Sequence, residues 1–477
     1  MKKISLFQAL IPILLLVLLL FFNVFFVFGD EALDGSNQFI LLIGGAIAAL
    51  IGFYNGVPYK TMISEISENV KSTTSALVIL LMVGALSGTW MASGIIPTIV
   101  YYGLQILNPS FFLVASLISC AIVSISTGSS WTTTATVGIA LILIGGALNI
   151  PNGMTAGAVL SGAYFGDKLS PLSDTTNLAP AMAGADLFTH IRYMTITTIP
   201  TFAITFLIFL ILGLNLNIEG SSNISNKLNA ISDVFNISPW LLIVPTLVIF
   251  MIFKKTPPLT ALFTGVILAS ILIIIAQPQI IFLITNEESI TFTNSYEAIM
   301  KSITSEVKIN TRSTDLNKLF SSDGMKGMMG TIWLILCAMV FGGVMSAIGA
   351  LSKITKAILK TTSTIFGLFA STVCSCLALN LTASDQYLAL VVPGKMYQQA
   401  FEDNKLAPEN LSRTLEDSGT VTSVLVPWNT CGAYQSGTLG VSVGEYFVYA
   451  FFNWISPFMT LLVAALSIKI KRLKINN

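Results

Sequence analysis

Oxygen-rich side chains interrupt an otherwise apolar sequence at two places that lie far apart along the chain. The first interruption runs from Ser126 to Thr134, and a string with two carboxylates, Gly166 to Asn177, follows it. A sodium ion stripped of water needs several hard oxygen ligands, which hydroxyls, amides, carboxylates and the carbonyls of an unwound helix can supply. These residue types predict a cation site, and nothing in the pattern requires a catalytic nucleophile.

The second interruption resembles the first. Its polar strings are 380–386, 416–420 and 427–432. Three pairs of segments match: Thr127-Gly128-Ser129 with Thr382-Ala383-Ser384, Asp167 with Asp417, and Asn177 with Asn429. We therefore expect two copies of one structural unit.

The predicted sodium ligands are oxygen-bearing side chains from both copies. They are Ser129, Ser130, Thr133, Asp167, Asp174, Thr175, Thr176, Asn177, Ser384, Asp385, Asp417, Asn429 and Thr430. A carboxylate at mid-membrane costs about 3 kcal/mol to insert, and burial favours its neutral form. A protonated aspartate and an ionised aspartate that holds sodium are then alternative states of one site, and no cofactor is expected.

Several of these residues have a second interpretation. Lys168 could pair with Asp167 or Asp174 at a helix end, in which case neither carboxylate contacts sodium. The hydroxyls of the first interruption could serve close helix packing. Glu416 follows a strongly charged string and could be a solvated loop residue. His190, the only histidine, could sense pH or be an ordinary interface residue.

The composition indicates which elements must hold these residues. The chain has 477 residues, of which 54% are hydrophobic and 10% charged, against about 25% charged in soluble domains. The bilayer must therefore be its solvent. The 24 basic and 23 acidic residues nearly balance, which argues against nucleic acid as a partner. Five cysteines without a CxxC pair indicate neither a zinc site nor a disulfide framework.

Apolar runs of spanning length predict an all-α, multi-pass membrane protein with roughly 12 to 14 transmembrane segments, some of them broken or re-entrant. The N-terminal run lacks a small-x-small cleavage pattern, so we interpret it as a membrane helix. The full runs are 9–28, 38–57, 76–96, 110–126, 194–214, 238–253, 259–277, 329–350, 362–378 and 443–467, and the interrupted ones are 134–149, 153–167, 381–394 and 418–436.

Basic residues in the short loops predict the orientation. Both termini and the lysine-rich loops are then cytoplasmic, whereas the acidic link 30–34 and the polar segments 217–236 and 278–327 lie outside. In this topology 110–126 enters the membrane from outside and 362–378 enters from inside, so the two copies are inverted repeats. Inverted repeats with polar breaks at mid-membrane are typical of secondary transporters. The basic positions are Lys2, Lys3, Lys60, Lys71, Lys254, Lys255, Lys353, Lys356, Lys360, Lys469, Lys471, Arg472 and Lys474.

The same layout divides the chain into five parts. These are N-terminal membrane helices (1–105), the first repeat with the broken-helix motifs (106–216), connecting membrane helices (217–277), an extracytoplasmic polar linker (278–327), and the second, inverted repeat with the C-terminal helix (328–477). The linker is too short and too polar to form a core of its own.

Two long strings resemble the NhaC family of sodium/proton antiporters. They are Ser161-Gly-Ala-Tyr-Phe-Gly-Asp-Lys-Leu-Ser-Pro-Leu-Ser-Asp-Thr-Thr-Asn-Leu-Ala179, and Glu416-Asp-Ser-Gly-Thr420 with Pro427-Trp-Asn-Thr-Cys-Gly-Ala-Tyr434. The resemblance implies exchange of cytoplasmic Na⁺ for external H⁺, a location in the bacterial inner membrane, contact with lipid and no enzymatic activity. A homo-oligomer is compatible with it.

Two other functions are compatible with parts of the sequence. The family also contains exchangers of organic solutes such as dicarboxylates, lactate or amino acids. An organic anion would call for a basic residue facing the site, and the repeat cores offer only Lys168 and Lys395. A remote alternative is an intramembrane serine protease that uses Gly128-Ser129-Ser130 with His190. An ATP-driven pump is disfavoured because Gly394-Lys395 lacks the remainder of a phosphate loop.

Overall fold

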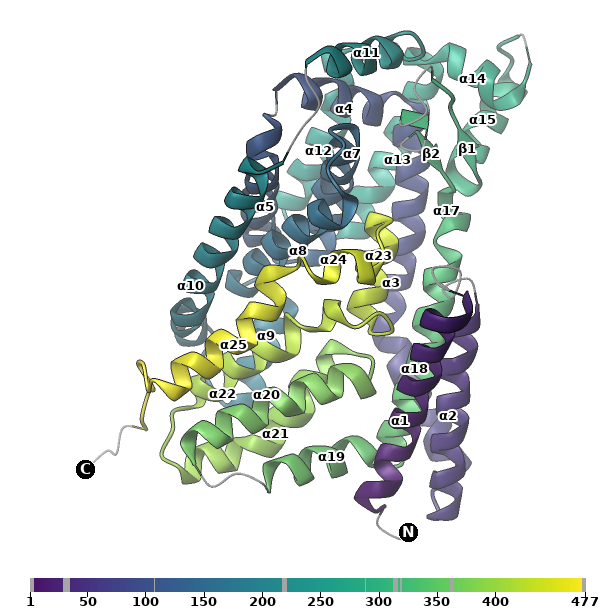
Figure 1. The fold of residues 1–477 in the computed structure, drawn as a ribbon. Coiled ribbons are helices and arrows are strands. Elements are labelled where there is room, and N and C mark those ends of the chain that lie inside the picture. Colours follow the sequence, from purple (N-terminus) through teal and green to yellow (C-terminus); the bar gives the residue numbers. More distant parts are fainter. Residues whose placement is uncertain are drawn as a thin grey trace.

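The structure, a computed structural model, is built almost entirely of helices (Figure 1). It describes residues 4–28, 35–106, 108–216, 221–287, 289–311, 316–317, 320–360 and 364–473. Within these ranges the one sheet is a ribbon of two short antiparallel strands, β1 (Val307–Lys308) and β2 (Ser321–Ser322). The acidic link 30–34 and the basic residues Lys2, Lys3 and Lys474 lie outside the described residues.

Nine helices of the described chain are long and apolar enough to cross a membrane. They are α1–η1 (Leu6–Phe28), α2 (Ser36–Tyr54), α3 (Tyr59–Ala92), α5 (Pro109–Thr127), α6–η3–α7 (Ser130–Ala147), α10 (Leu187–Leu214), α13 (Pro258–Ala276), α17–α18 (Gly324–Ala347) and α20 (Ile365–Thr382). Three shorter apolar helices are α4 (Ile95–Ile106), η4–α12 (Pro239–Phe253) and α25 (Phe451–Ala465). The predicted all-α, multi-pass class is confirmed.

The remaining helices connect or interrupt these spans. They are α8 (Asn152–Leu169), α9 (Asp174–Ala183), α11 (Ser221–Ser232), α14 (Pro278–Thr285), α15 (Phe292–Thr304), α19 (Ala350–Leu359), α21 (Gln386–Asp403), α22 (Pro408–Leu415), η5 (Glu416–Thr420), η6 (Ser423–Leu425), α23 (Thr430–Leu439) and α24 (Val443–Phe447). The predicted span 443–467 is thus two helices, separated by the turn at 448–450.

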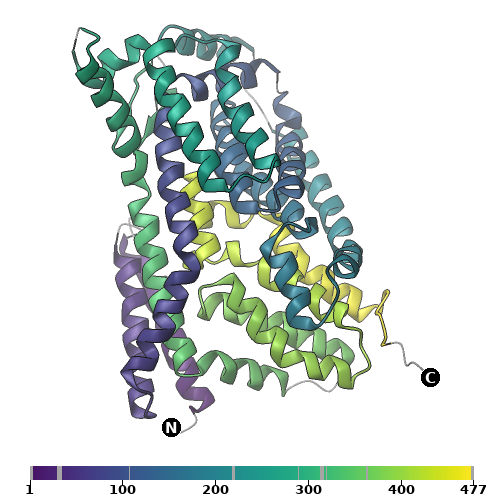
Figure 2. The same ribbon diagram turned by 180° about the vertical axis from the view of Figure 1, so that it is seen from behind.

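Helices α2, α3 and α18 run side by side and form one flank of the molecule (Figures 1 and 2). Gly343 of α18 makes this close approach possible, because a Cβ there would lie 2.7 Å from the backbone of Ile66 in α3.

The 34 residues of α3 make it about 51 Å long at 1.5 Å per residue. The loop expected around Lys60 and Lys71 is therefore wrong, since both residues lie within α3. No proline or glycine interrupts 59–83, so the helix continues past the apolar part.

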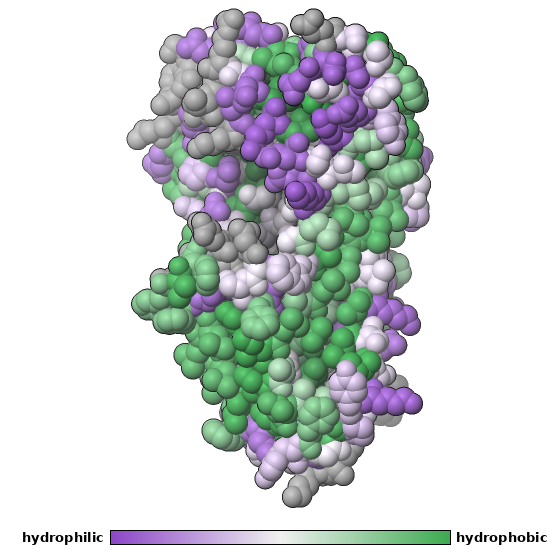
Figure 3. All heavy atoms as spheres, turned by 90° about the vertical axis from the view of Figure 1, so that its right-hand side faces the viewer, coloured by the Kyte–Doolittle hydropathy of each residue, from purple (hydrophilic) through white to green (hydrophobic). Residues whose placement is uncertain are grey.

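The surface of this flank carries a broad apolar belt below a hydrophilic end (Figure 3). The polar segment 278–327, expected to be a linker, contributes α14, α15 and the β ribbon to that end (Figure 1). It also buries apolar side chains, because Ile309, Leu316 and Phe320 are at most 1% exposed and the Phe320 ring packs 5.4 Å from that of Phe235. These side chains belong to an apolar cluster formed mainly by other segments, so this segment packs onto the membrane helices.

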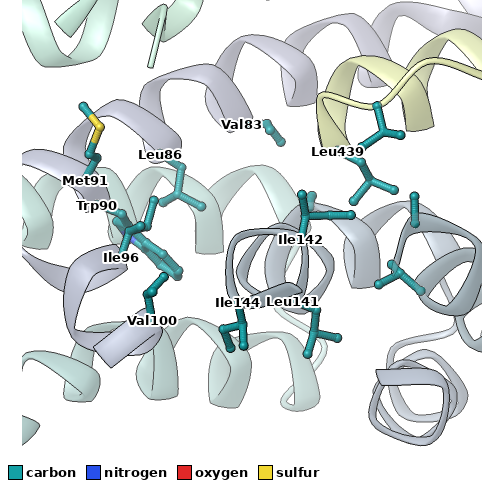
Figure 4. Close-up of a cluster of buried hydrophobic side chains, with 14 of the residues drawn as sticks. Val83, Leu86, Trp90, Met91, Ile96, Val100, Leu141, Ile142, Ile144 and Leu439 are labelled. Atoms are coloured by element: carbon teal, nitrogen blue, oxygen red, sulfur yellow. The ribbon is translucent and has the colours of Figure 1, made fainter. Parts of the chain in front are cut away.

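An apolar cluster joins the flank to the interior of the molecule. Figure 4 shows side chains of α3, α4, α7 and α23 converging, among them Trp90, Val100, Ile142 and Leu439. The C-terminal end of α23 is held in this cluster. The short helix that follows the second polar break is therefore anchored against the first half of the chain.

Backbone landmarks show that residues 108–186 and 364–442 are the same unit without an insertion or a deletion. Each second-unit landmark follows its counterpart by 256 residues. The helix N-caps pair as Asn108 with Thr364, Ser129 with Asp385, Ser173 with Asn429 and Asp186 with Ser442; the positive-φ residues pair as Gly128 with Ser384, Asn149 with Lys405 and Gly184 with Gly440.

This register corrects the alignment that the sequence suggested. The Gly128 position corresponds to Ser384, one residue later than expected, and Asp167 corresponds to Ser423 instead of Asp417. Residue chemistry was misleading because caps and positive-φ turns accept several residue types. The repeat is conserved in backbone geometry more than in side chains.

The two units enter the molecule from opposite ends. Helix α5 follows α4 near the upper end in Figure 1, and α20 follows α19 near the lower end. Both then stop at a positive-φ residue, Gly128 or Ser384, inside the molecule. The inverted arrangement agrees with the prediction, and it brings the two broken helices together at mid-height.

Candidate functional site

The first break in the membrane helices lies between α5 and α6. Gly128 ends α5 with φ of +69°, and a Cβ there would lie 2.6 Å from Leu172, so this residue must be small. Ser129 then starts α6, and its hydroxyl accepts a hydrogen bond from the backbone N–H of Thr132 at 3.1 Å. The break is thereby pressed against the loop between α8 and α9.

Asp167 faces this break from the end of α8. It is 8% exposed, and its carboxylate accepts two hydrogen bonds from Ser130, from the backbone N–H at 3.1 Å and from the hydroxyl at 2.7 Å. The hydroxyl of Thr176 donates to its carbonyl oxygen at 3.1 Å. Asp167 is thus held by neutral donors, and none of these bonds supplies a counter-charge.

A cavity of about 680 Å³ extends from the turn between α12 and α13 to this carboxylate. Side chains of the first repeat line it, and so do two residues of the second repeat. The lining includes Thr127, Ser129, Asp167, Ser173, Asp174, Thr175, Lys255, Gln386 and Tyr387. Four predicted ligands, Ser129, Asp167, Asp174 and Thr175, therefore share one polar cavity, with Ser130 hydrogen-bonded to Asp167 behind it.

The second break gathers the predicted residues of the second repeat. Asp385 caps α21 by accepting from the N–H of Leu388 at 3.0 Å. Asn429 caps α23 by accepting from the N–H of Cys431 at 3.0 Å. The N–H of Thr430 donates to the carbonyl oxygen of Ser384 at 2.9 Å. The helix ends at 384–386 and 429–430 are therefore joined directly.

Tyr387 links the two breaks. It lies in the first turn of α21, which Asp385 caps, and together with Gln386 it lines the cavity that Asp167 and Asp174 also line. Trp131 of the first break also stacks on Tyr434 of α23, with ring centroids 4.1 Å apart. The two broken helices meet in one polar region.

Asp417 occupies a different environment. Its carboxylate binds the ammonium of Lys168, and both side chains are fully buried. The hydroxyls of Ser456 and Thr460 in α25 also donate to Asp417. The alternative expectation that Lys168 pairs with Asp167 or Asp174 is therefore wrong, and Lys168 instead connects the two repeats by an ion pair.

Three predicted ligands use their side chains to support the backbone in this structure. The amide of Asn177 donates to the carbonyls of Pro171 and Ser173 and is exposed. Thr176 donates to backbone carbonyls of α8. Thr133 donates to the carbonyl oxygen of Ser129 at 2.9 Å. They shape the break, and a direct contact with an ion remains a prediction for them.

The donor set consists of one buried carboxylate with hydroxyl and carbonyl oxygens. In the described part of the chain, no three His, Cys, Asp or Glu side chains gather closely enough to hold a metal ion. Hard, mostly neutral oxygen donors around a single carboxylate suit a weakly held monovalent cation better than a transition metal.

A protein-family model described as the Na⁺/H⁺ antiporter family matches residues 162–468. The chain belongs to this family. Among its relatives, the Na⁺/H⁺ antiporter NhaC of Bacillus subtilis (strain 168) is 35% identical over 425 residues, 89% of this chain and 91% of the relative. The Na⁺/H⁺ antiporter NhaC of Alkalihalophilus pseudofirmus OF4 is 36% identical over 422 residues, 88% of each chain.

The malate-2H⁺/Na⁺-lactate antiporter of Bacillus subtilis (strain 168) is similarly related. It is 35% identical over 458 residues, 95% of this chain and 92% of the relative. The resemblance to NhaC antiporters predicted from the two polar strings is therefore confirmed. Membership of the Na⁺/H⁺ antiporter family agrees with the multi-pass helical fold.

In this Na⁺/H⁺ antiporter family member, sequence reasoning misjudged the string before Asp417. The charged string before Glu416, which includes Glu409 and Arg413, was expected to be a loop, and for Glu416 a solvated loop position was one of two interpretations; all three residues are buried in α22 and η5. His190 is also fully buried, and its Nδ1 lies 2.7 Å from the Ser412 hydroxyl. The run from Pro408 to Glu416 without glycine was the available signal for a helix.

Proposed function

We propose that this protein exchanges cytoplasmic Na⁺ for external H⁺ by alternating access. Two Na⁺/H⁺ antiporters are related to it over almost the whole chain, which supports the proposal. The observation that carries it is Asp167, a buried carboxylate that pairs with no basic side chain among the described residues and is reached through a cavity. A carboxylate in such a place attracts a cation strongly when ionised and not at all when neutral.

In the proposed cycle, Na⁺ enters the cavity and binds Asp167 together with nearby oxygens of the first break. Ser129, Ser173 and Thr175 line the same cavity and supply such oxygens. Ser130 keeps the carboxylate in place through its two hydrogen bonds. Protonation of the buried carboxyl groups then favours release of Na⁺, so that the two ions exclude each other.

The arrangement of cavities supports alternating access. The large cavity extends to the α12–α13 turn with Lys255, the end we assign to the cytoplasm because basic loops gather there. A second cavity of about 430 Å³ lies among α3, α17 and the C-terminal end of α23, lined by Ser322 and Thr438. We place the protein in the bacterial plasma membrane, with both termini in the cytoplasm and this second cavity facing outside.

Exchange of an organic solute is the second candidate. One relative is a malate-2H⁺/Na⁺-lactate antiporter, and a cavity of about 680 Å³ is within the range that binds small organic ligands, roughly 300–1,000 Å³. The buried Lys168 does not favour this function, because Asp417 already neutralises it. A basic side chain available to an anion is present in the cavity only near its mouth, at Lys255, within the described residues.

Reconstituted exchange tests both candidates. Vesicles with the purified protein are loaded with a pH indicator, and Na⁺, Li⁺, K⁺, malate or lactate is added outside. Na⁺ should change the internal pH, and Asp167→Asn should abolish this change. Asp403→Asn, an exposed aspartate of α21, is the matched control and should be active. A wild-type response that needs malate or lactate would favour the organic exchanger, and an active Asp167→Asn variant would exclude Asp167 from the site.

A further inference from the structure

Helix α19 connects two membrane-spanning helices at the lower end of the molecule. It lies between α17–α18 and α20, which are both long and apolar enough to cross a membrane. Figures 1 and 2 both show it running across the lower end, where it packs against α1. An amphipathic helix that joins the ends of two spans in this way lies at the membrane surface.

One side of α19 carries three lysines. Lys353, Lys356 and Lys360 are three and four residues apart in helical backbone, so they lie on one face. The opposite face is apolar and buried, with Leu351 and Ile354 at most 5% exposed. The three side chains, which we call the lysine row, therefore point away from the packed side of α19.

No negative charge compensates the lysine row within the described part of the chain. None of its three members forms an ion pair with a described residue. They are the only charged residues from 329 to 382. Of the helices packed against α19, which are α1, α18, α20 and α21, only α21 carries charged side chains. Three like charges held together repel one another, and an anion placed against them relieves this repulsion.

The fold does not require lysines in this helix. The counterpart of α19 at the upper end is α4, because each follows a long helix at a glycine with positive φ, Gly94 at +77° or Gly349 at +74°, and each precedes a broken helix. This register pairs the three lysines with Thr98, Tyr101 and Gln105. The same element thus forms without any charge at the opposite surface, so the lysine row is specific to the lower one.

Exposed apolar side chains flank α19 on two sides. Phe7 and Leu14 of α1 are 74% and 56% exposed, and Phe366 of α20 is 44% exposed. Both helices pack against α19. The orientation of membrane helices requires basic residues only somewhere in a connection. A row on one helical face beside two apolar surfaces matches, in addition, both parts of an anionic phospholipid, the charged headgroup and the acyl chains.

We propose that the lysine row of α19 binds the headgroups of anionic phospholipids such as phosphatidylglycerol, whose acyl chains lie against α1 and α20. In the proposed orientation these lipids belong to the cytoplasmic leaflet. Each lysine near an anionic membrane surface contributes roughly fivefold to the affinity. The inference does not depend on which ion the protein transports, and its test needs no exchange.

Native mass spectrometry of the purified full-length protein in detergent counts the bound lipids directly. The protein is titrated with phosphatidylglycerol or with phosphatidylcholine of the same acyl chains, and glycerol phosphate is added as a competitor in a third titration. The wild type should bind phosphatidylglycerol at least about tenfold more tightly than phosphatidylcholine, and glycerol phosphate should not displace it. Equal affinity for the two lipids would overturn the proposal. Displacement by equimolar glycerol phosphate would also overturn it, in favour of a soluble anion.

The variant Lys353→Gln/Lys356→Gln/Lys360→Gln should bind phosphatidylglycerol at least about tenfold more weakly than the wild type and phosphatidylcholine equally well. Size-exclusion chromatography checks that it is folded. If it is not, Lys356→Gln at an exposed position replaces it, with an expected loss of roughly fivefold. Wild-type affinity for phosphatidylglycerol in the folded variant would contradict the proposal.

The matched control removes three lysines from the upper end of the molecule. It is Lys301→Gln/Lys308→Gln/Lys326→Gln, which changes the net charge by the same amount. Lys301 and Lys308 already pair with glutamates of their own segments, so this variant should bind both lipids as the wild type does. An equal loss of phosphatidylglycerol binding in the control would show that only the total charge matters and would overturn the assignment to α19.

Discussion

Asp167 and Asp417 are residues of the same type whose surroundings give them different roles. Asp417 binds the buried ammonium of Lys168, so its charge is permanently compensated. Asp167 receives hydrogen bonds from neutral groups, among them the N–H and the hydroxyl of Ser130, and lines a cavity. A mobile cation can compensate the charge of Asp167 and cannot easily reach Asp417. Selectivity for a transported ion therefore depends on which carboxylate lacks a partner.

The buried ion pair predicts a specific pattern of stabilities. Lys168→Met or Asp417→Asn alone should destabilise the protein by about 3 to 5 kcal/mol, because each leaves one charge buried without a partner. The double variant Lys168→Met/Asp417→Asn should recover much of this loss. Thermal unfolding in detergent, followed by size-exclusion chromatography, measures all three. A double variant that is less stable than both single variants would contradict the predicted pairing.

Asp174 should matter less than Asp167. It is exposed at the first position of α9 and lines the cavity, so it raises the local concentration of cations without being desolvated. Asp174→Asn should raise the Na⁺ concentration for half-maximal exchange roughly two- to fivefold, an effect on the order of 1 kcal/mol or less. Dose–response curves of exchange measure this. Complete loss of exchange with intact folding would place Asp174 among the direct ligands.

The sequence located much of the candidate site but not its pairings. Residue types alone pointed to Ser129, Asp167 and Asp174, which do line one cavity. They could not show that Lys168 meets a carboxylate 249 positions away, because contacts between distant segments depend on the assembled fold. Glu416 was ambiguous for a related reason, since a dense charged string looks solvated until its helix is packed into the interior.

At the scale of elements, each break depends on one residue with positive φ. Gly128 adopts φ of +69° and Ser384 adopts φ of +57°. Glycine tolerates this conformation without cost, whereas another L-residue loses roughly 1 to 2 kcal/mol. The second break is therefore held in a less favourable backbone state than the first, although the two occupy the same place in the repeat.

This difference predicts opposite effects of two substitutions. Gly128→Ala should destabilise strongly, since its Cβ would lie 2.6 Å from Leu172. Ser384→Gly should stabilise the folded backbone by up to about 1 kcal/mol. Thermal unfolding measures both. The Na⁺ affinity of exchange is a second measurement on Ser384→Gly. This affinity should fall if the Ser384 hydroxyl is a ligand, and it should not change if only the backbone at this position matters.

Element prediction from the sequence succeeded where apolar runs end in clear breakers. Helix α5 begins at Pro109 and stops before Gly128, within one residue of the expected 110–126. It failed for α3, whose first part is polar but contains no breaker, so the helix extends beyond the apolar run. The sequence-based prediction also treated α24 and α25 as one span, because the turn at 448–450 is as apolar as the helices beside it.

At the scale of the molecule, the orientation can be tested by chemical labelling. Single cysteines are introduced into a variant without the five native ones, at Leu259 in the large cavity and at Ser322 in the second cavity. A membrane-impermeant maleimide should label Ser322→Cys in intact cells and Leu259→Cys only in inside-out vesicles. The reverse pattern would contradict the predicted orientation while leaving the fold unchanged.

Labelling should also depend on the transported ion if the large cavity is the route to Asp167. Saturating Na⁺ should slow modification of Leu259→Cys more than that of Ser322→Cys, because a cation in the cavity and the closure that follows both restrict access.

The whole-molecule shape could not be predicted from the sequence, since the packing of α2, α3 and α18 depends on interhelical contacts that leave no periodic signal in uniformly apolar segments.

The equal length of the two repeats bears on how such a molecule could arise. Residues 108–186 contain a single basic residue, Lys168, and it is buried. Because basic residues in the loops set the orientation of membrane helices, a unit with so few of them has almost no preferred orientation in the bilayer. An ancestral copy of it could insert in both directions and pair with its own inverted twin. Gene duplication and fusion would then have fixed one direction for each half.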